Sequence, residues 1–390
     1  MIENNSLPKV SVLINTFNRS SLLRRSVGSV LGQDYPNIEL IIIDDASTDN
    51  TEDVVRSFAS DKIRYIKNPE NLGSKHGDRL MAKRFMYEYA TGEYCVYLCD
   101  DDYWLPKDLL SRQVSLFMKY ENLSAVIGGM AQIWPTPVDL TPAPHGATWF
   151  KEYVPSIKNA TFNRNIFPQG FISSDDFLYL YSSDIANRNI LTGATLYKKS
   201  KFIEAGIFSG DGSKWQAGYE WQAGIATVGD IYYLDEPCVM AEVDINSASY
   251  RGTQYAHMMD CLVSISCAFN KVRQNFTAYK QTNFYQHESR MKQSVIMTYA
   301  LNQLTYKLGH FDNNPLEGIK KIFSVPITAR DFWHAISSYD IPLSKYNLLL
   351  IFLSISPRKI ALYFKSLLHR QRPDWMEHYS KFTESLKKDT

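Results

Sequence analysis

Short apolar segments alternate with segments of helical pattern in the N-terminal part of the chain, and this alternation constrains the fold more than any other feature. The apolar segments are Val10–Ile14, Glu39–Ile43, Ile63–Lys67 and Tyr94–Leu98. Short runs that are rich in β-branched residues and largely continuous are typical of parallel strands covered on both faces. The sequence therefore predicts an open α/β fold, in which helices flank a parallel sheet.

Acidic residues directly follow two of these segments. Asp100, Asp101 and Asp102 end the fourth segment, and Asp44 and Asp45 end the second. Ligands of open α/β sheets bind beyond the carboxyl ends of the strands. Three adjacent carboxylates repel one another unless a cation or hydrogen-bond donors neutralise them, and their oxygens suit Mg²⁺ or Mn²⁺. Two interpretations of the triplet stand: a metal site, or a solvated acidic turn that caps the next helix.

Several classes of function lack their signatures in this chain. The sequence contains no G-x-G-x-x-G, no Walker A loop and no G-x-S-x-G. Its formal net charge of +1 argues against nucleic-acid binding. The N-terminus has no signal-peptide pattern, and the apolar run Leu348–Ile355 is too short to cross a bilayer. We therefore expect a cytoplasmic protein.

The remainder of the chain divides into two parts. Strand character returns at Ile190–Tyr197 and Asp230–Met240, and between them Ala217–Val228 has a helical pattern that contains Glu220. After Asn246, apolar residues recur at helical spacing. The sequence therefore predicts an α/β domain over residues 1–246 and a helical C-terminal domain over residues 247–390.

The motifs of the first part resemble a known family. The strongest of them are Val10–Arg19, Ile41–Thr51, Asn71–Gly73 and Gly92–Pro106, and weaker ones are Gly206–Phe208, Gly218–Trp221 and Tyr233–Pro237. In order and spacing they resemble the family 2 inverting glycosyltransferases of GT-A fold. This resemblance implies a Rossmann-like mixed sheet of GT-A type flanked by helices, and a nucleotide-sugar donor.

The resemblance also implies roles for particular residues. Those expected to bind the nucleotide sugar are Asn15, Thr16, Phe17, Asp45, Arg79 and Asp100. Asp101 and Asp102 are expected to hold Mn²⁺ or Mg²⁺. Cys99 stands where many members have the first Asp of a D-x-D motif. Asp244, at a position that is His in many members, is interpreted either as an extra metal ligand or as a solvated loop acid.

The resemblance assigns the catalytic base to Glu220, because family members carry Glu-Asp where this chain has Tyr219-Glu220. In an inverting transfer, a carboxylate must remove the proton of the acceptor hydroxyl as that oxygen attacks the sugar. The neighbouring aromatic residues Trp215, Tyr219 and Trp221 are expected to form a wall against which a sugar stacks. The alternative interpretation of Glu220 is an exposed acid on a helix surface.

The C-terminal segment 348–372 combines an apolar run with five basic side chains and no acid among them. The basic residues are Arg358, Lys359, Lys365, Arg370 and Arg372. Such a segment is typical of peripheral contact with an anionic membrane. The alternative is a helix whose apolar face belongs to the domain core.

We therefore expect a metal-dependent inverting glycosyltransferase. Its donor would be a nucleoside diphosphate sugar of UDP or dTDP type, and its acceptor a hydroxyl of a cell-surface glycan or lipid-linked precursor. In this interpretation the helical domain contacts the inner face of the cell membrane or the acceptor. The alternative, from another class, is a non-catalytic nucleotide-sugar-binding or scaffolding protein with a degenerate site.

Overall fold

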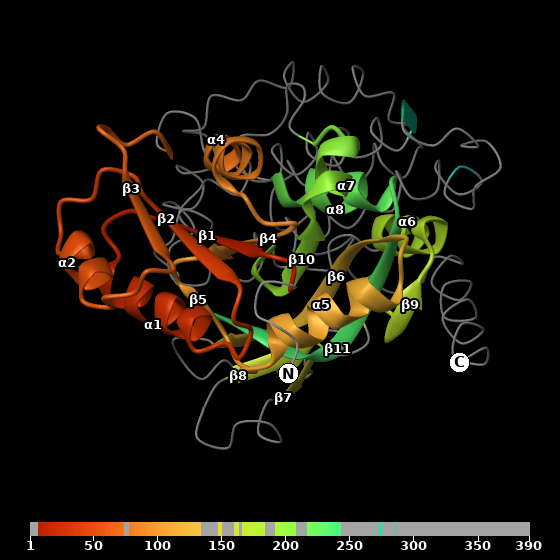
Figure 1. Ribbon diagram of the computed structural model, residues 1–390. Coiled ribbons are helices and arrows are strands. Elements are labelled where there is room, and N and C mark those ends of the chain that lie inside the picture. The colour runs from red at the N-terminus through yellow and green to blue at the C-terminus, as the bar shows by residue number, and fades with distance from the viewer. Residues whose placement is uncertain are drawn as a thin grey trace, which may run out of the picture.

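The structure is a computed structural model, and it describes residues 7–73, 78–133, 147–149, 160–163, 166–183, 192–207, 217–242, 273, 274 and 285 (Figure 1). The predicted helical domain, with its boundary at residue 246 and the basic segment 348–372, lies outside this described part, apart from residues 273, 274 and 285. Trp215 and Asp244 also lie outside it. The predicted α/β part is described over most of its length.

The first half of the α/β part alternates strands and helices as predicted. In chain order its elements are β1 (Val10–Thr16), α1 (Ser20–Leu31), β2 (Ile38–Asp44), α2 (Thr51–Arg56), β3 (Ile63–Lys67), α4 (Asp78–Arg84), the π-helical turn η2 (Phe85–Tyr89) and β4 (Tyr94–Cys99). The strands pair in parallel in the order β3-β2-β1-β4. The predicted parallel sheet is therefore confirmed in this half.

The second half turns the sheet into a mixed one. Its elements are β5 (Asp102–Trp104), α5 (Leu109–Lys119), β6 (Leu123–Ile133), β7 (Ala147–Trp149), β8 (Ala160–Asn163), β9 (Gly170–Ile172), α6 (Ser174–Ser183), the 3₁₀ turn η4 (Thr192–Ala194), β10 (Thr195–Lys198), α7 (Lys199–Glu204), α8 (Ala217–Ala226) and β11 (Asp230–Glu242). β10 pairs antiparallel with both β4 and β6, whereas β11 pairs parallel with β6. The expected GT-A type mixed sheet is thus the fold observed.

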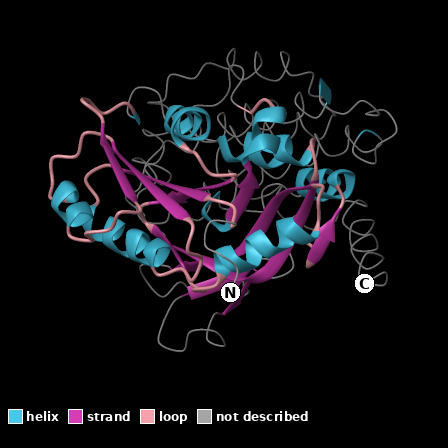
Figure 2. Cartoon of the chain, viewed as in Figure 1, coloured by secondary structure: helices cyan, strands magenta, loops and turns pink. Residues whose placement is uncertain are grey.

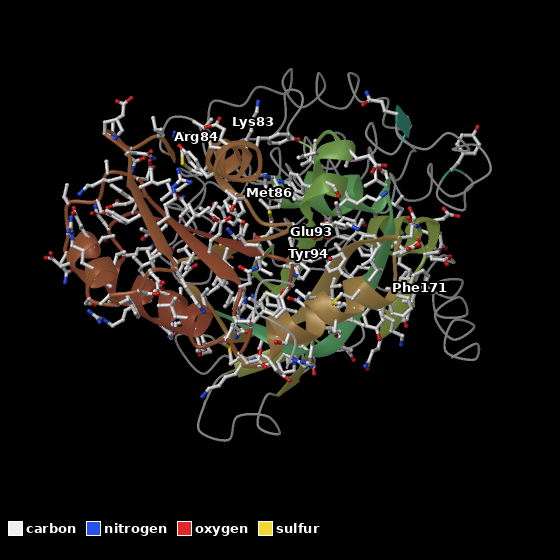
Figure 3. The ribbon with its side chains drawn as sticks, in the orientation of Figure 1. Lys83, Arg84, Met86, Glu93, Tyr94 and Phe171 are labelled. Atoms are coloured by element: carbon white, nitrogen blue, oxygen red, sulfur yellow. The ribbon has the colours of Figure 1, made fainter. Side chains whose placement is uncertain are left out.

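Helices cover both faces of this sheet, as Figure 2 shows. On one face lie α1, α2 and α5, and on the other lie α4, α7 and α8 (Figure 1). β1 supplies both layers, because Val12 and Ile14 are buried with α1 while Leu13 is buried with α4. In Figure 3, Met86 points from the helical segment after α4 towards the sheet, whereas Lys83 points away from it. Apolar side chains thus face the core and polar side chains face outwards, with the period of the strand or helix that carries them.

Candidate active site

The acidic residues of the sequence meet at one edge of the sheet. β1, β2 and β4 are parallel neighbours, and in register Thr16 lies opposite Asp44 while Asn15 lies opposite Cys99. Parallel strands in register end together, so the residues that follow them are brought side by side. The structure therefore unites the predicted Asn15 and Thr16 with the strand-end acids.

Asp100 is buried and is held on two sides. One carboxylate oxygen accepts a hydrogen bond from Thr16 Oγ1 at 2.8 Å, and the other accepts one from Arg19 Nη1 at 3.2 Å. Burial, and secondly the neighbouring Asp101, raise the pKa of Asp100 to about 6. Thr16 and Arg19 favour the charged form and partly oppose these effects. The position of the Asp100 carboxylate at this edge of the sheet is therefore fixed by its two hydrogen bonds.

Asp101 is the more accessible neighbour and shares the same arginine. Its Oδ2 lies 2.9 Å from Arg19 Nη1, and its side chain is 19% exposed. Arg19 is thus a built-in cation between two adjacent carboxylates. Sequence reasoning did not single out Arg19, although it belongs to the Val10–Arg19 motif and its position four residues after Asn15 was the available signal.

Asp102 is the most deeply buried of the three acids, at 4% exposure. Burial raises its pKa well above the usual range, and the charges of Asp101 and Asp100 add to the effect. The Ser26 hydroxyl lies within hydrogen-bond distance of the backbone carbonyls of both Asp100 and Asp102, so α1 fixes the path of this turn. The interpretation as a merely solvated acidic turn does not fit acids that are this buried.

The three residues Cys99, Asp101 and Asp102 suit a metal ion. One ligand atom from each lies within 4.8 Å of the others. Two of these atoms are carboxylate oxygens, the donors that Mn²⁺ and Mg²⁺ prefer, and Arg19 offsets only part of the negative charge of the edge. The described residues therefore fit the expected divalent cation.

Asp45 anchors the loop that follows β3. Its Oδ1 accepts hydrogen bonds from Asn68 Nδ2 at 2.8 Å and from the Leu72 amide at 2.9 Å, and its Oδ2 accepts one from the Gly73 amide at 2.7 Å. A Cβ atom at Gly73 would lie 2.9 Å from Asp45 Oδ2, so a larger residue would have to displace this hydrogen-bonded carboxylate. Three of the four lone-pair positions of the carboxylate are used in this way.

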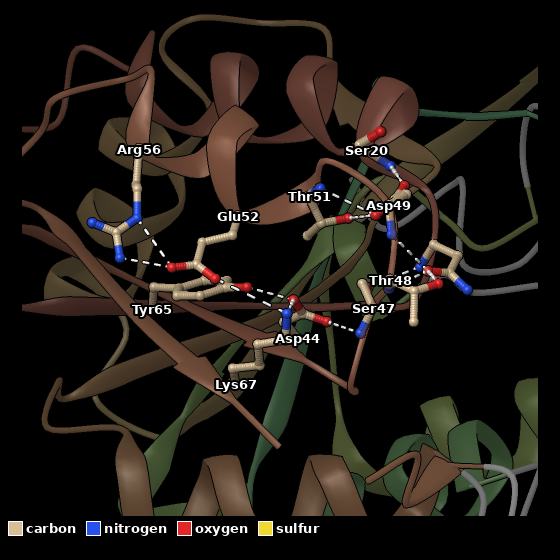
Figure 4. Close-up of polar contacts among 11 residues, drawn as sticks. Ser20, Asp44, Ser47, Thr48, Asp49, Thr51, Glu52, Arg56, Tyr65 and Lys67 are labelled. Atoms are coloured by element: carbon tan, nitrogen blue, oxygen red, sulfur yellow. Dashed lines mark hydrogen bonds and ion pairs between the residues drawn. The ribbon is translucent and has the colours of Figure 1, made fainter. Parts of the chain in front are cut away.

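Asp44 has a structural role in the turn that follows β2. Its Oδ1 accepts a hydrogen bond from the Ser47 amide at 2.7 Å, and its Oδ2 accepts one from the Tyr65 hydroxyl (Figure 4). Ala46 has a φ of 67°, a conformation that non-glycine residues rarely adopt. The turn after β2 is therefore held in shape by Asp44.

A second network joins the turns before α1 and α2. Asp49 Oδ2 accepts a hydrogen bond from the Ser20 amide at 3.1 Å, and Asp49 Oδ1 accepts one from the Thr51 amide at 3.1 Å (Figure 4). Asn18 Oδ1 accepts one from the Thr48 amide at 2.8 Å. These bonds satisfy backbone donors at two helix starts and tie the β1 and β2 turns into one platform.

The remaining predicted residues are placed as follows. Phe17 is 42% exposed beside this platform, and Asn15 Oδ1 is a buried acceptor with no hydrogen-bond partner among the described residues. The backbones of Tyr219 and Glu220 lie in α8 and that of Arg79 lies in α4, but their side chains are outside the described part of the structure.

Trp221, expected in a sugar-stacking wall, is instead part of the core. It is 2% exposed and makes edge-on contacts with Tyr97, Tyr197 and Phe202 at centroid distances of 5.5, 6.1 and 5.7 Å. An indole that is almost completely buried among other rings stabilises the packing of α8 on the sheet, and it has no exposed face on which a sugar could stack. We therefore do not include Trp221 in the site.

Comparison with known proteins defines the class to which this fold and site belong. Residues 11–175 match the family described as glycosyl transferase family 2, so this part of the chain is a family 2 glycosyltransferase domain. The crystal structure of S. aureus TarS 1-349 has a similar fold, with a TM-score of 0.55 and 15% identity, over 88% of this chain and 86% of that chain.

Two curated relatives also show sequence similarity to this chain. The GalNAc(5)-diNAcBac-PP-undecaprenol beta-1,3-glucosyltransferase of Campylobacter jejuni is 35% identical over 118 residues, which is 30% of this chain and 35% of the relative. The UDP-Glc:alpha-D-GlcNAc-diphosphoundecaprenol beta-1,3-glucosyltransferase WfgD of Escherichia coli is 32% identical over 119 residues, which is 30% of this chain and 44% of the relative. The chain thus spans less than half the length of these relatives.

Proposed function

We propose that this chain is a metal-dependent inverting glycosyltransferase that moves a sugar from a UDP or dTDP sugar to a hydroxyl of a lipid-linked glycan precursor. The observation that carries the proposal is the acidic edge, in which Asp100, Asp101 and Asp102 lie together beside Thr16 and Arg19. The printed names of the two relatives support the acceptor class, since both act on undecaprenol-linked diphosphates, and that of WfgD supports a UDP sugar.

The protein groups would divide the reaction between two sides of the donor sugar. Glu220 would take the proton of the acceptor hydroxyl, which is the role that the resemblance implies for it. Arg19 holds a positive charge beside Asp100 and Asp101, at the edge where the diphosphate would leave. A divalent cation bound by Asp101 and Asp102 would supply Lewis-acid stabilisation of that leaving group. An inverting transfer needs no covalent nucleophile.

The hydrogen-bond capacity of Asp45 supports a pyrimidine base. One lone-pair position of its carboxylate remains after the three bonds to the 68–73 loop, and uracil and thymine each present a single ring N–H donor. Asn15 Oδ1 is a second acceptor at this edge, and a ribose hydroxyl would satisfy it. Both atoms therefore fit a UDP or dTDP donor.

Asp45→Ala is expected to weaken UDP binding by about 1 to 3 kcal/mol, the usual cost of losing a hydrogen bond to a buried partner. Because the change also leaves the Leu72 and Gly73 amides without their acceptor, the free energy of unfolding should fall by about 2 kcal/mol. Calorimetric titration with UDP and chemical denaturation measure the two effects separately. The exposed Asp53→Ala serves as the control. Reduced stability with unchanged UDP affinity would show that Asp45 only holds the loop.

Hydrolysis of a donor in the presence of Mn²⁺ separates an enzyme from a non-catalytic binding protein. A thermal-shift comparison of UDP, dTDP and GDP sugars identifies the donor class, because a ligand at 100 times its Kd stabilises the folded state by about 2.7 kcal/mol. We expect hydrolysis of a UDP or dTDP sugar, with no comparable stabilisation by GDP sugars. Stabilisation without any turnover would instead support the scaffolding alternative.

The proposal includes contact between segment 348–372 and an anionic membrane, because the acceptors named for the relatives are lipid-linked. In the described part of the chain, no helix combines the length and apolar content needed to span a bilayer. The full-length protein is expected to co-sediment with anionic vesicles at low salt and to be released at high salt. Failure to bind at low salt would place the segment in the core.

A further inference from the structure

The thiol of Cys99 lies where a metal ligand would be expected. Cys99 ends β4 and is partly buried, and its Sγ lies within 4.8 Å of one carboxylate oxygen of Asp101 and one of Asp102. A hydrogen bond also links its side chain to Asp102. Cys99 therefore lies at the boundary between these acids and the hydrophobic core, against which it also packs.

The separation of these three atoms suits a single ion. In zinc sites, metal–sulfur bonds are about 2.3 Å long and metal–oxygen bonds about 2.0 to 2.2 Å, so a sulfur and an oxygen on opposite sides of one ion lie about 4.5 Å apart, and ligands that are not opposite lie closer. The three ligand atoms lie within 4.8 Å of one another, so they would have to draw closer together to bind one ion. Cys99, Asp101 and Asp102 are thus close enough together to serve as ligands of one cation.

We propose that Cys99 is a thiolate ligand of the divalent metal and makes this site select Mn²⁺ and other sulfur-tolerant ions over Mg²⁺. The inference rests on the proposed function, in which Asp101 and Asp102 hold the metal. Mg²⁺ takes oxygen ligands at short distances and in near-ideal octahedral geometry. Thiolates favour softer ions such as Zn²⁺, and Mn²⁺ and Co²⁺ tolerate them better than Mg²⁺ does. One sulfur in place of an oxygen therefore changes the metal preference.

The metal–sulfur bond has a signature that does not depend on turnover. Co²⁺ bound to a thiolate absorbs in the near ultraviolet by sulfur-to-metal charge transfer, whereas Co²⁺ bound by oxygen ligands alone does not. Titration of the full-length protein with Co²⁺, kept reduced, should give this band, saturating at one equivalent. Cys99→Ser and Cys99→Asp should abolish it. In competition calorimetry, Cys99→Asp should lower the ratio of Mn²⁺ affinity to Mg²⁺ affinity by about tenfold or more. Mutation of residues around a metal commonly changes its affinity by at least this factor.

Cys95→Ala is the matched control, because Cys95 is a buried cysteine of the same strand and lies outside the metal cluster. It should keep the band. Stoichiometric Co²⁺ binding without a charge-transfer band would overturn the role of Cys99 and leave the metal site standing. The same conclusion would follow if the band persisted in both Cys99 variants. Absence of Mn²⁺ and Co²⁺ binding in the wild type would instead refute the metal dependence on which the inference rests.

Discussion

Replacement of Asp101 by alanine is expected to abolish sugar transfer and the metal-dependent part of UDP binding. Asp101 is the most accessible acid of the triplet, and the change removes one of the two carboxylates expected to hold the cation. Loss of Lewis-acid stabilisation costs several kcal/mol in the transition state, which corresponds to about 10³-fold in rate or more. Transfer assays with a UDP sugar, and UDP titrations with and without Mn²⁺, measure the two effects.

The fold should survive this change, because Arg19 keeps its contact with Asp100 at 3.2 Å. Thermal unfolding without metal checks this point. Asp61→Ala, which removes an exposed acid next to β3, is the control and should retain wild-type activity within about twofold. Activity of Asp101→Ala close to wild type, or full activity of the wild type in excess chelator, would refute the metal assignment.

Glu220→Gln is expected to lower the rate of transfer by about 10² to 10⁴ while leaving UDP and metal affinity unchanged. Glutamine keeps the size of the side chain and can still hydrogen-bond the acceptor hydroxyl, but it cannot take the proton. The motivation is the place of Glu220 in the Gly218–Trp221 motif, and the structure locates this residue in α8 before β11. Transfer rate and donor affinity should be measured on the same variant.

The matched control is Glu204→Gln on α7, which covers the same face of the sheet as α8 (Figure 1). Glu204 is exposed and forms an ion pair only with the neighbouring Lys201 among the described residues, so its replacement should change the rate less than twofold. Near-normal transfer by Glu220→Gln would identify an ordinary helix acid. Loss of donor binding would make Glu220 a binding residue rather than the base.

The sequence predicted the parallel half of the fold because each strand and helix of this half can be recognised from the pattern of a short segment. The strands β1 to β4 were visible as apolar runs, and the acids that end β2 and β4 stood at a sheet edge by the geometry of parallel strands alone. The role of Asp44 in the turn after β2 was not predicted, although its signal is local, since the side chain accepts a hydrogen bond from an amide only three residues along the chain. A helix was also found between β3 and β4, as the alternation of apolar and helical segments predicts, although its last turn is π-helical.

Contacts between distant segments were decided only by the tertiary structure. β6 was not predicted, although it is a long buried strand that lies between β10 and β11. Its neighbours come from far along the chain, and no local period records which strand pairs with which. Trp221 was expected to face a sugar, yet it is buried. The prediction was wrong because the pattern of a helix does not show how much of each of its sides is covered when it packs on the sheet.

The electrostatics of the site also depend on segments far apart in the sequence. The sequence by itself determined that three carboxylates follow one another at the end of β4. Only the tertiary structure brought Arg19, 81 and 82 residues away, into contact with both Asp100 and Asp101, and only the tertiary structure buried Asp102. The physical reason is that the charge and burial of a group depend on whatever packs around it, and sheet register brings such neighbours together irrespective of their separation in the chain.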